Sequence, residues 1–492
     1  MLKDKIKILA SDTLTYGIFQ TFSRFFTFLL TPLYSNYLTT QDNGIMAYIF
    51  SLIIFLQFTY AFGMEAAFFR FFNKNDEAKN KKVFSNAYIF IALVSSFFTL
   101  LILFFSEPIA KEMIGADVEN SIYILQIACL IPFFDGLIAI PYGRLRMIRE
   151  IKRFAITKFL LVLLSVLLTA YFVIFTNLGL IGVFIGTLIS STVGIIIFLP
   201  NILKMLDFNI DKKLFAEMFK FGLPTLPSNL SIIILQVADR PIMKMFISNA
   251  EIGIYQINAK LAVPMLMFVS VFDYAWKPFF LTNYNDDEAK KLFSRVLTYF
   301  LLVASLIFLV ISLFIEYIVR IPLWSGRYFI HPDYWSGMSV VSIIMLGYLL
   351  NGVTTNFAAV FHIEKKTKYL PVAVGISAII SICMNFILIP LIGMYGAAIS
   401  LLVGYFSGTI IMKYLHSKVD YKINYEWKRI IILIIVTTLL YIGNRILVGQ
   451  NIGLELLFII KIIIFLAYIL LLRVFNFFTV GEIKQLKKIF GK

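Results

Sequence analysis

Long apolar segments recur along the whole of this 492-residue chain, and they restrict it to folds that cross a membrane. About fourteen of these segments contain roughly 18 residues or more, enough for a helix to cross ~30 Å of hydrocarbon. Hydrophobic residues form 60% of the chain and charged residues 15%, which excludes an ordinary soluble globular protein. Backbone groups in lipid must be satisfied internally, so the sequence predicts an all-α integral membrane protein. The predicted spans are residues 12–36, 44–69, 83–105, 121–142, 155–175, 181–200, 221–247, 252–281, 296–319, 337–360, 370–390, 394–415, 430–448 and 453–473.

The chain repeats itself at an offset of 209 residues. Under this offset Pro32 pairs with Pro241, Gly44 pairs with Gly253, and the segment KVFS at 82–85 pairs with KLFS at 291–294. A repeat of this length exceeds a solenoid unit, and in a membrane it indicates two homologous helical lobes. Each lobe has six predicted spans, an even number, so the two lobes are expected to be parallel and to face each other across a central cavity.

The repeat divides the chain into four predicted regions. They are the N-lobe with helices 1–6 at residues 1–200, a cytoplasmic linker at 201–220, the C-lobe with helices 7–12 at 221–415, and helices 13 and 14 with a cytoplasmic tail at 416–492. Four apolar residues of the linker have helical spacing: Leu214, Phe215, Met218 and Phe219. They favour an amphipathic helix on the inner surface, although an ordinary solvated linker explains them equally well.

Basic residues are distributed unevenly between the two sides of the predicted membrane. The chain has 44 Lys and Arg against 28 Asp and Glu, and most of the basic residues lie before the first span, in alternate loops and after the last span. The positive-inside rule therefore places both termini in the cytoplasm. Topology and attraction to anionic lipid heads explain the charge, so nucleic acid is not an expected partner.

Two of the predicted helices carry polar residues on one face. The polar positions are Gln20, Arg24, Thr27 and Thr31 in the first helix, and Asn229, Gln236, Arg240 and Lys244 in the seventh. The offset pairs three of them across the repeat: Gln20 with Asn229, Thr27 with Gln236, and Thr31 with Arg240. Lipid would favour apolar residues at these positions, so the pattern predicts that both helices line a hydrated cavity between the lobes.

Three cations lie well inside predicted spans: Arg24, Arg240 and Lys260. A charge at the bilayer centre costs ~2.5–3.5 kcal/mol on insertion scales, so each is a candidate for binding substrate. Cations that face one cavity suit an anionic ligand such as a phosphate or pyrophosphate. Alternatively, each cation pairs with a nearby acid; Asp239 adjoins Arg240, although neighbours on a regular helix point about 100° apart.

Four acids also lie inside predicted spans: Glu65, Asp135, Asp239 and Asp273. Each could carry a coupling proton or sodium ion, or could be a static partner for a residue such as Lys277. Asp135-Gly136 aligns with Asn351-Gly352 at an offset of 216, so that position is polar in both lobes. Cys129 and Cys383 fall in separate spans, and no strong enzyme motif or Cys/His cluster is present, so neither a metal site, an organic cofactor nor catalysis is expected.

Prolines and one further lysine have two interpretations each. Pro224, Pro227 and Pro264 either bend helices 7 and 8 or mark the points where helices begin. Lys461 lies in helix 14, and a lysine that snorkels to the surface is a better explanation than one that marks a lateral groove for a lipid.

The chain resembles the multidrug/oligosaccharidyl-lipid/polysaccharide (MOP) exporter superfamily, and within it the polysaccharide transporter branch of Wzx-type O-antigen flippases. The similarity lies in SRFFTFLLTPLYSNYLTTQDNGIMAY of helix 1, GMEAAFFRFF at the end of helix 2, and FGLPTLPSNL with ADRPIMKMF of helix 7. EIGIYQINAKLA and the turns GLIG and GMYG fit as well. The resemblance covers essentially the whole chain, but these degenerate motifs identify the superfamily better than the substrate.

The resemblance implies a non-enzymatic flippase in the bacterial cytoplasmic (inner) membrane. Its substrate would be an undecaprenyl-pyrophosphate-linked oligosaccharide, such as an O-antigen repeat unit of lipopolysaccharide, moved to the outer leaflet by alternating access. Arg24 and the pair Asp239-Arg240 match the pattern of that branch, whereas Lys260 rests on its position alone. The family further implies coupling to H⁺ or Na⁺, contact with membrane lipids and other polysaccharide-assembly proteins, and function as a monomer.

Two other functions fit parts of the sequence. A MATE-like drug or metabolite antiporter would share the superfamily, but such proteins commonly stop at twelve spans and use acids for cationic drugs. A membrane glycan polymerase or ligase would need a long outer loop with paired acids or arginines, and residues 325–337 form only a short one.

Overall fold

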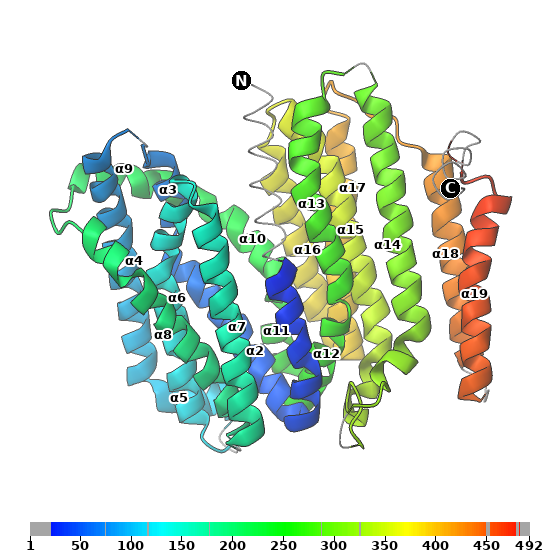
Figure 1. Cartoon of the computed structure of the whole chain (residues 1–492), viewed down its shortest axis with the longest axis horizontal. Helices are drawn as coiled ribbons and strands as arrows, with labels where there is room; N and C mark the ends of the chain where they lie inside the picture. Colours follow the sequence, from blue (N-terminus) through cyan, green and yellow to red (C-terminus); the bar gives the residue numbers. More distant parts are fainter. Residues whose placement is uncertain are drawn as a thin grey trace.

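The computed structural model describes residues 21–73, 75–115, 118–176, 178–286, 288–323, 326–448, 453–478 and 482. In Figure 1 the helices form two groups: α3–α9 lie at the left, and α13–α19 lie at the right, with α18 and α19 at the outer edge. Between the groups lie α2, α10, α11 and α12. The two groups come together in the lower part of this view.

Residues 21–37 are helical. The helices that follow in the first part of the chain are α2 (Thr40–Ala61), α3 (Met64–Phe71), α4 (Glu77–Phe104), α5 (Ser106–Ala110), α6 (Ser121–Met147), α7 (Ile151–Phe175) and α8 (Gly179–Met205). Those of the second part are α9 (Lys212–Gly222), α10 (Leu226–Val237), α11 (Asp239–Phe246), α12 (Asn249–Leu261), α13 (Val263–Asn283), α14 (Ala289–Val319), α15 (Met338–Ile363), α16 (Tyr369–Ile392), α17 (Met394–His416), α18 (Trp427–Val448) and α19 (Leu454–Val474).

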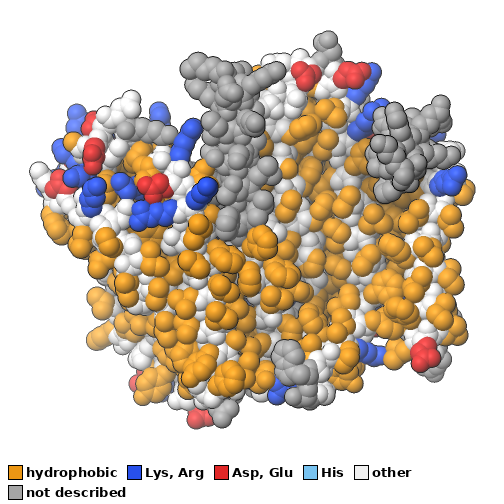
Figure 2. Space-filling view, viewed as in Figure 1, with side chains coloured by type: hydrophobic (Ala, Val, Ile, Leu, Met, Phe, Trp, Pro, Cys, Tyr) orange, Lys and Arg blue, Asp and Glu red, His pale blue; other side chains and the backbone are white. Residues whose placement is uncertain are grey.

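Among the described residues, twelve helices are long and apolar enough to cross a membrane, and α12 with α13 forms a thirteenth, bent span. Together with the helical residues 21–37, they account for the fourteen predicted segments. The predicted all-α membrane fold with about fourteen helices is therefore confirmed. Figure 2 shows a broad apolar band across this face of the molecule, with Lys and Arg gathered mainly at its upper end.

Three of the predicted helices are broken. The span at 44–69 divides into α2 and α3 at Phe62 and Gly63, which both have positive φ angles. The span at 221–247 divides into α10 and α11, and α12 and α13 meet at a bend of 47°. Pro264 lies in the first turn of α13, where its missing N–H needs no partner, so this proline marks a helix start at the bend.

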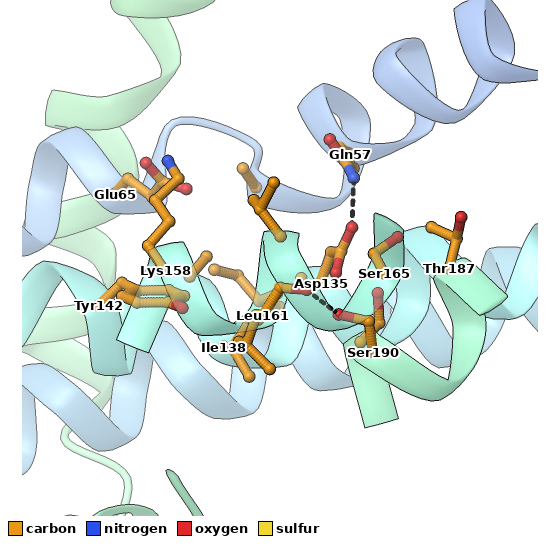
Figure 3. A pocket seen from close by; sticks show the side chains of 16 residues that line it. Gln57, Glu65, Asp135, Ile138, Tyr142, Lys158, Leu161, Ser165, Thr187 and Ser190 are labelled. Carbon is orange, nitrogen blue, oxygen red and sulfur yellow. Dashed lines mark hydrogen bonds between the residues drawn. The ribbon is translucent and has the colours of Figure 1, made fainter. Parts of the chain in front are cut away.

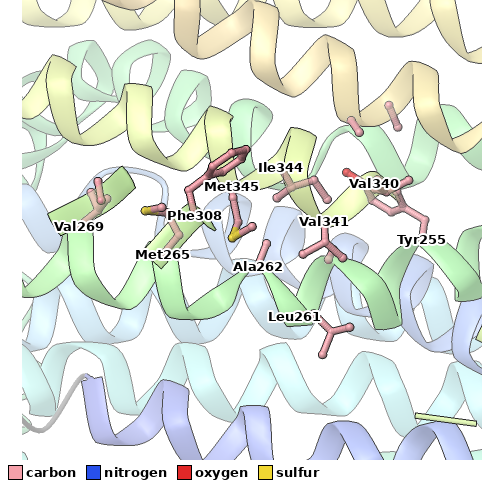
Figure 4. Close-up of a cluster of buried hydrophobic side chains, with 14 of the residues drawn as sticks. Tyr255, Leu261, Ala262, Met265, Val269, Phe308, Val340, Val341, Ile344 and Met345 are labelled. Atoms are coloured by element: carbon pink, nitrogen blue, oxygen red, sulfur yellow. The ribbon is translucent and has the colours of Figure 1, made fainter. Parts of the chain in front are cut away.

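The bend between α12 and α13 is packed from one side by two long helices (Figure 4). Ala262 and Met265 beside the bend are fully buried, and Phe308 of α14 and Met345 of α15 pack in the same cluster. Burial of these side chains stabilises the right-hand group of helices through dispersion contacts.

A backbone crossing of α2 and α12 joins the two halves of the molecule. A Cβ atom added to Gly44 would lie 1.7 Å from the carbonyl oxygen of Asn249, and one added to Gly253 would lie 1.9 Å from the oxygen of Thr40. Only glycine permits this approach. Gly44 and Gly253 are equivalent under the 209-residue offset, as are Thr40 and Asn249, so the crossing is locally two-fold symmetric.

Equivalent caps begin both of these helices. The Thr39 hydroxyl accepts a hydrogen bond from the Asp42 N–H at 3.1 Å, and the Ser248 hydroxyl accepts one from the Glu251 N–H at 3.2 Å. Each satisfies a backbone donor that the first turn of a helix leaves unpaired. The repeat therefore preserves the start of each helix together with the glycine that follows it.

The predicted amphipathic helix of the linker is present as α9. Its Phe215 and Phe219 lie 5.5 and 5.9 Å from the ring centre of Phe90 in α4. Asp211 caps α9 by accepting from the Leu214 N–H at 3.0 Å, and this bond lowers the pKa of the Asp211 carboxyl. The start of the second repeat is thus packed on helices of the first, and the four region boundaries remain predictions.

The predicted snorkelling of Lys461 is wrong. Its side chain is only 1% exposed, and its Nζ lies 2.8 Å from Oε2 of Glu316 in α14. The pairing was hidden in the sequence because Glu316 is 145 residues away and belongs to another helix. The ion pair holds α19 against the right-hand group, where a lone charge in lipid would be costly. The predicted interfacial tail around 483–489 lies outside the described residues.

We expect Gly253→Ala to destabilise the protein by about 1–3 kcal/mol, because its new methyl group would overlap the Thr40 backbone. The matched control is Gly443→Ala in α18, where a Cβ would meet no atom within 4 Å and helix propensity favours alanine. Thermal unfolding in detergent compares the two variants. Equal midpoints for both would contradict a tight crossing.

Candidate functional site

Arg240 and Asp239 form an ion pair at the start of α11. Arg240 Nη1 lies 2.7 Å from Asp239 Oδ1, and the two side chains are only 12% and 6% exposed. The Tyr255 hydroxyl donates to the other carboxylate oxygen of Asp239 at 2.7 Å. Arg240 therefore pairs with the adjacent acid, the alternative that the sequence left open, although both residues lie in the first turn of α11.

The guanidinium group of Arg240 is held by further acceptors. Nε and Nη2 donate to Gln256 Oε1 at 3.3 and 3.2 Å, and Nη1 donates to the backbone oxygen of Gln236 at 2.8 Å. These bonds orient the planar group, and Asp239 neutralises its charge. Arg240 is consequently a fixed donor and contributes little net positive charge.

Arg24 links the first helix to the opposite half of the molecule. Its Nη1 donates to the Ser270 hydroxyl of α13. The Tyr348 hydroxyl of α15 interacts electrostatically with both Arg24 and Arg240, and Tyr405 of α17 interacts with Arg24. The two predicted arginines therefore both lie within electrostatic range of Tyr348.

Lys260 lies near the end of α12, and no acid contacts its side chain among the described residues. Its Nζ lies 4.1 Å from the centre of the Tyr34 ring, a favourable cation–π geometry. In the described part of the chain, no carboxylate lies within 4.0 Å of this ammonium group. Lys260 and Arg24 are thus two predicted cations that lack a direct acidic partner among the described residues.

The other predicted polar positions have different environments. Thr31 is fully buried, and its hydroxyl has no hydrogen-bond partner among the described residues. Thr27 is exposed and donates to the Ser23 oxygen at 3.0 Å, and Asn229 and Gln236 are exposed. Gln20 lies outside the described residues.

A cavity of about 440 Å³ with polar and apolar walls, here called the N-side cavity, lies among α2, α3, α4, α6, α7 and α8 (Figure 3). Glu65 and Asp135, two of the predicted acids, line it together with Gln57 and Lys158. Gln57 Nε2 donates to Asp135 Oδ2 at 2.8 Å. Sequence reasoning missed Lys158, although a lysine inside the predicted span 155–175 was a sufficient signal.

A second cavity of about 380 Å³, the C-side cavity, lies among α10, α13, α15, α16 and α17. Asp273 and Lys277 line it and form an ion pair at 3.1 Å, one of the predicted static pairings. Asn351 lines this cavity as its repeat partner Asp135 lines the other. Arg24, Arg240 and Lys260 line neither of these two cavities.

Metal ligands are not clustered in the part of the chain that the structure describes: no group of three or more His, Cys, Asp and Glu side chains could hold an ion. The described acids are instead distributed between ion pairs such as those of Arg240 and Lys461, the two cavities and the surface.

Residues 36–325 match the model of a family described as polysaccharide biosynthesis protein. The chain belongs to this family. No curated protein matches its sequence. The family match covers the α2–α12 crossing, Arg240 and the N-side cavity, and it ends after α14.

Solved structures show that this family member has the fold of the MOP superfamily, as the resemblance predicted. The lipid II flippase MurJ in an inward closed conformation has a TM-score of 0.71 and 18% identity, covering 94% of this chain and 98% of that chain. An inward-facing multidrug resistance MATE transporter of the MOP superfamily has a TM-score of 0.61 and 13% identity, covering 84% and 94%. An outward-facing MATE transporter has a TM-score of 0.54 and 15% identity, covering 83% and 95%.

Asp239→Ala should destabilise the protein by about 3–5 kcal/mol, because it leaves Arg240 buried without its charged partner. The control is Asp273→Ala, which removes a half-exposed pair worth about 1 kcal/mol or less. Denaturant unfolding of the purified protein measures both. Similar stabilities for the two variants would show that the Asp239–Arg240 pair is not desolvated.

Proposed function

We propose that this protein is a flippase for an undecaprenyl-pyrophosphate-linked oligosaccharide, such as an O-antigen or other surface-polysaccharide repeat unit. Membership of the polysaccharide biosynthesis family and the flippase-like fold support a lipid-linked substrate. The proposal places the protein in a bacterial cytoplasmic membrane with both termini inside. Its expected partners are the lipid-linked glycan, surrounding lipids and other proteins of polysaccharide assembly.

The observation that carries the proposal is the positive charge between the two groups of helices. Arg24 and Lys260 have no carboxylate in contact among the described residues, and Arg240 is held close to Tyr348 like Arg24. A pyrophosphate supplies the missing negative charge and can accept bidentate bonds from arginine. A cationic drug would be repelled by the same region, which disfavours the antiporter alternative.

The α2–α12 crossing suggests how access alternates. It joins the two halves at the end opposite most of the basic side chains, which the positive-inside rule assigns to the cytoplasm. The described state would then be closed toward the outside, and the higher similarity to the inward-facing transporter supports this assignment. Release outside requires the crossing to open, with H⁺ or Na⁺ coupling at one of the acids as part of the proposal.

Loss of the protein should cause intact lipid-linked oligosaccharide to accumulate on the inner leaflet. The amount of lipid-linked glycan in each leaflet is measured in cells with and without the gene. Cells are treated with an impermeant oxidant that reaches only the outer face, and the lipid-linked glycans are then extracted. Unchanged surface glycan would overturn the proposal, and unpolymerised units outside would favour a polymerase.

Arg24→Ala and Arg240→Ala should each lower export about 10-fold to 100-fold, because a charge-assisted hydrogen bond to phosphate contributes about 1.5–3 kcal/mol. Arg24→Lys should retain part of the activity, since it keeps the charge but not the fork. The control is Arg445→Ala on the exposed side of α18. Normal export by both alanine variants, at equal amounts of inserted protein, would contradict the cationic site.

A further inference from the structure

The N-side cavity holds charges of opposite sign that do not touch. Glu65 and Lys158 line the same cavity and interact electrostatically, yet they form no ion pair within 4.0 Å in the described structure. No hydrogen bond of the described residues engages the Glu65 carboxylate or the Lys158 ammonium group; Lys158 lies 5.8 Å from the centre of the Phe154 ring. The two charges therefore face a gap that another molecule can bridge.

The gap between the two charges is found in the N-side cavity and not between the charged residues of the C-side cavity. There Asp273 and Lys277 are one helical turn apart and contact each other directly at 3.1 Å. In the N-side cavity, Glu65 belongs to α3 and Lys158 belongs to α7. Their separation is therefore set by the packing of two helices and not by the spacing along one helix. Figure 3 shows both side chains at the same end of the cavity, away from Asp135 and Gln57.

The cavity combines charges of both signs. Glu65 interacts electrostatically with Arg146 as well as with Lys158, so these two cations balance Glu65 and Asp135, and the balance favours a neutral occupant. A hydroxyl group satisfies both signs, because it donates to a carboxylate and accepts from an ammonium group. The chemistry of the gap thus fits a neutral ligand with several hydroxyl groups.

The remaining polar lining points to the same ligand class. The Ser190 and Thr187 hydroxyls donate to the backbone oxygens of Leu161 and Val183 at 2.6 and 2.9 Å, which leaves their oxygen lone pairs as acceptors. The Asp135 carboxylate is an acceptor as well. A cavity rich in acceptors requires an occupant rich in donors.

Apolar side chains complete the cavity wall. Ile138, Leu161 and the Tyr142 ring line it beside the polar groups (Figure 3). Its volume of about 440 Å³ falls in the ~300–1,000 Å³ range of small-molecule sites, which combine apolar walls with a few placed polar groups. A sugar ring has this dual character, with hydroxyls at its edge and C–H groups on its faces.

We infer that the N-side cavity is a sugar subsite, in which Glu65 and Lys158 bridge hydroxyl groups of one ring. This inference rests on the proposed function and adds that two separate sites bind two different parts of the substrate. The arginine region between the lobes would hold the pyrophosphate, while the N-side cavity holds part of the oligosaccharide. The two ligand parts are separated because their charges require opposite surroundings.

Protection of an introduced cysteine tests the subsite. Ser165→Cys on the cavity wall is combined with Cys129→Ala and Cys383→Ala, and alkylation of the purified full chain by N-ethylmaleimide is timed. The probes are neutral hexoses and N-acetylhexosamines, with pyrophosphate and tetraethylammonium for comparison. Thr355→Cys in the C-side cavity is the matched control.

We expect at least one sugar to slow alkylation at position 165 but not at 355, and pyrophosphate and tetraethylammonium to have no effect. Glu65→Gln or Lys158→Met should weaken this protection about tenfold, as loss of one charge-assisted bond implies. The same sugars should raise the melting temperature of the wild-type chain but not that of Glu65→Gln. This second measurement decides the matter if position 165 is not alkylated.

Protection by tetraethylammonium or pyrophosphate instead of sugars would overturn the subsite, as would a lack of effect of every sugar in both measurements. Export assays separate this failure from failure of the proposed function. If Glu65→Gln and Lys158→Met export normally while loss of the protein still traps lipid-linked glycan inside, the subsite is wrong and the flippase stands.

Discussion

The direct contact of the α2 and α12 backbones at Gly44 and Gly253 is the constraint on which the rest of the structure depends. It brings equivalent parts of the two repeats together at one end of the molecule. Since the chain also connects the halves through α9, which packs against α3 and α4, the two groups of helices are tied at two places. The glycine crossing must separate if the halves rock against each other, whereas the connection through α9 is covalent and persists.

Ionisable side chains inside the apolar belt fall into two kinds. Lys461 with Glu316 and Arg240 with Asp239 are direct, buried pairs, and they hold helices or helix breaks in place. Arg24, Lys260 and Lys158 make no ion pair with the described residues within contact distance. A buried charge without a partner is costly in free energy. Such residues are therefore expected where a bound ligand supplies the missing partner. This contrast distinguishes the paired residues that stabilise the fold from the unpaired residues that we propose bind substrate.

Much of the fold could be predicted because its signals are local or repeated. Apolar length located the spans of the described residues, and the 209-residue repeat identified Gly44 and Gly253 as equivalent positions, although it did not predict their contact. Proline marks two of the helix breaks, because Pro264 lies in the first turn of α13 and Pro241 in the first turn of α11. The contact between the adjacent residues Asp239 and Arg240 depends on their side-chain conformations, which the sequence does not give.

The sequence by itself determined that the chain is a helical, duplicated membrane protein, because hydropathy and repetition can be read along the chain without knowledge of any contact. It also indicated which charges are out of place in a membrane. Only the tertiary structure decided which of those charges neutralise each other, because Lys461 finds Glu316 and Lys158 faces Glu65 across separate helices. Distances between helices depend on packing, which no local pattern encodes. These distances decide whether a charged side chain forms an ion pair within the fold or remains available to a ligand.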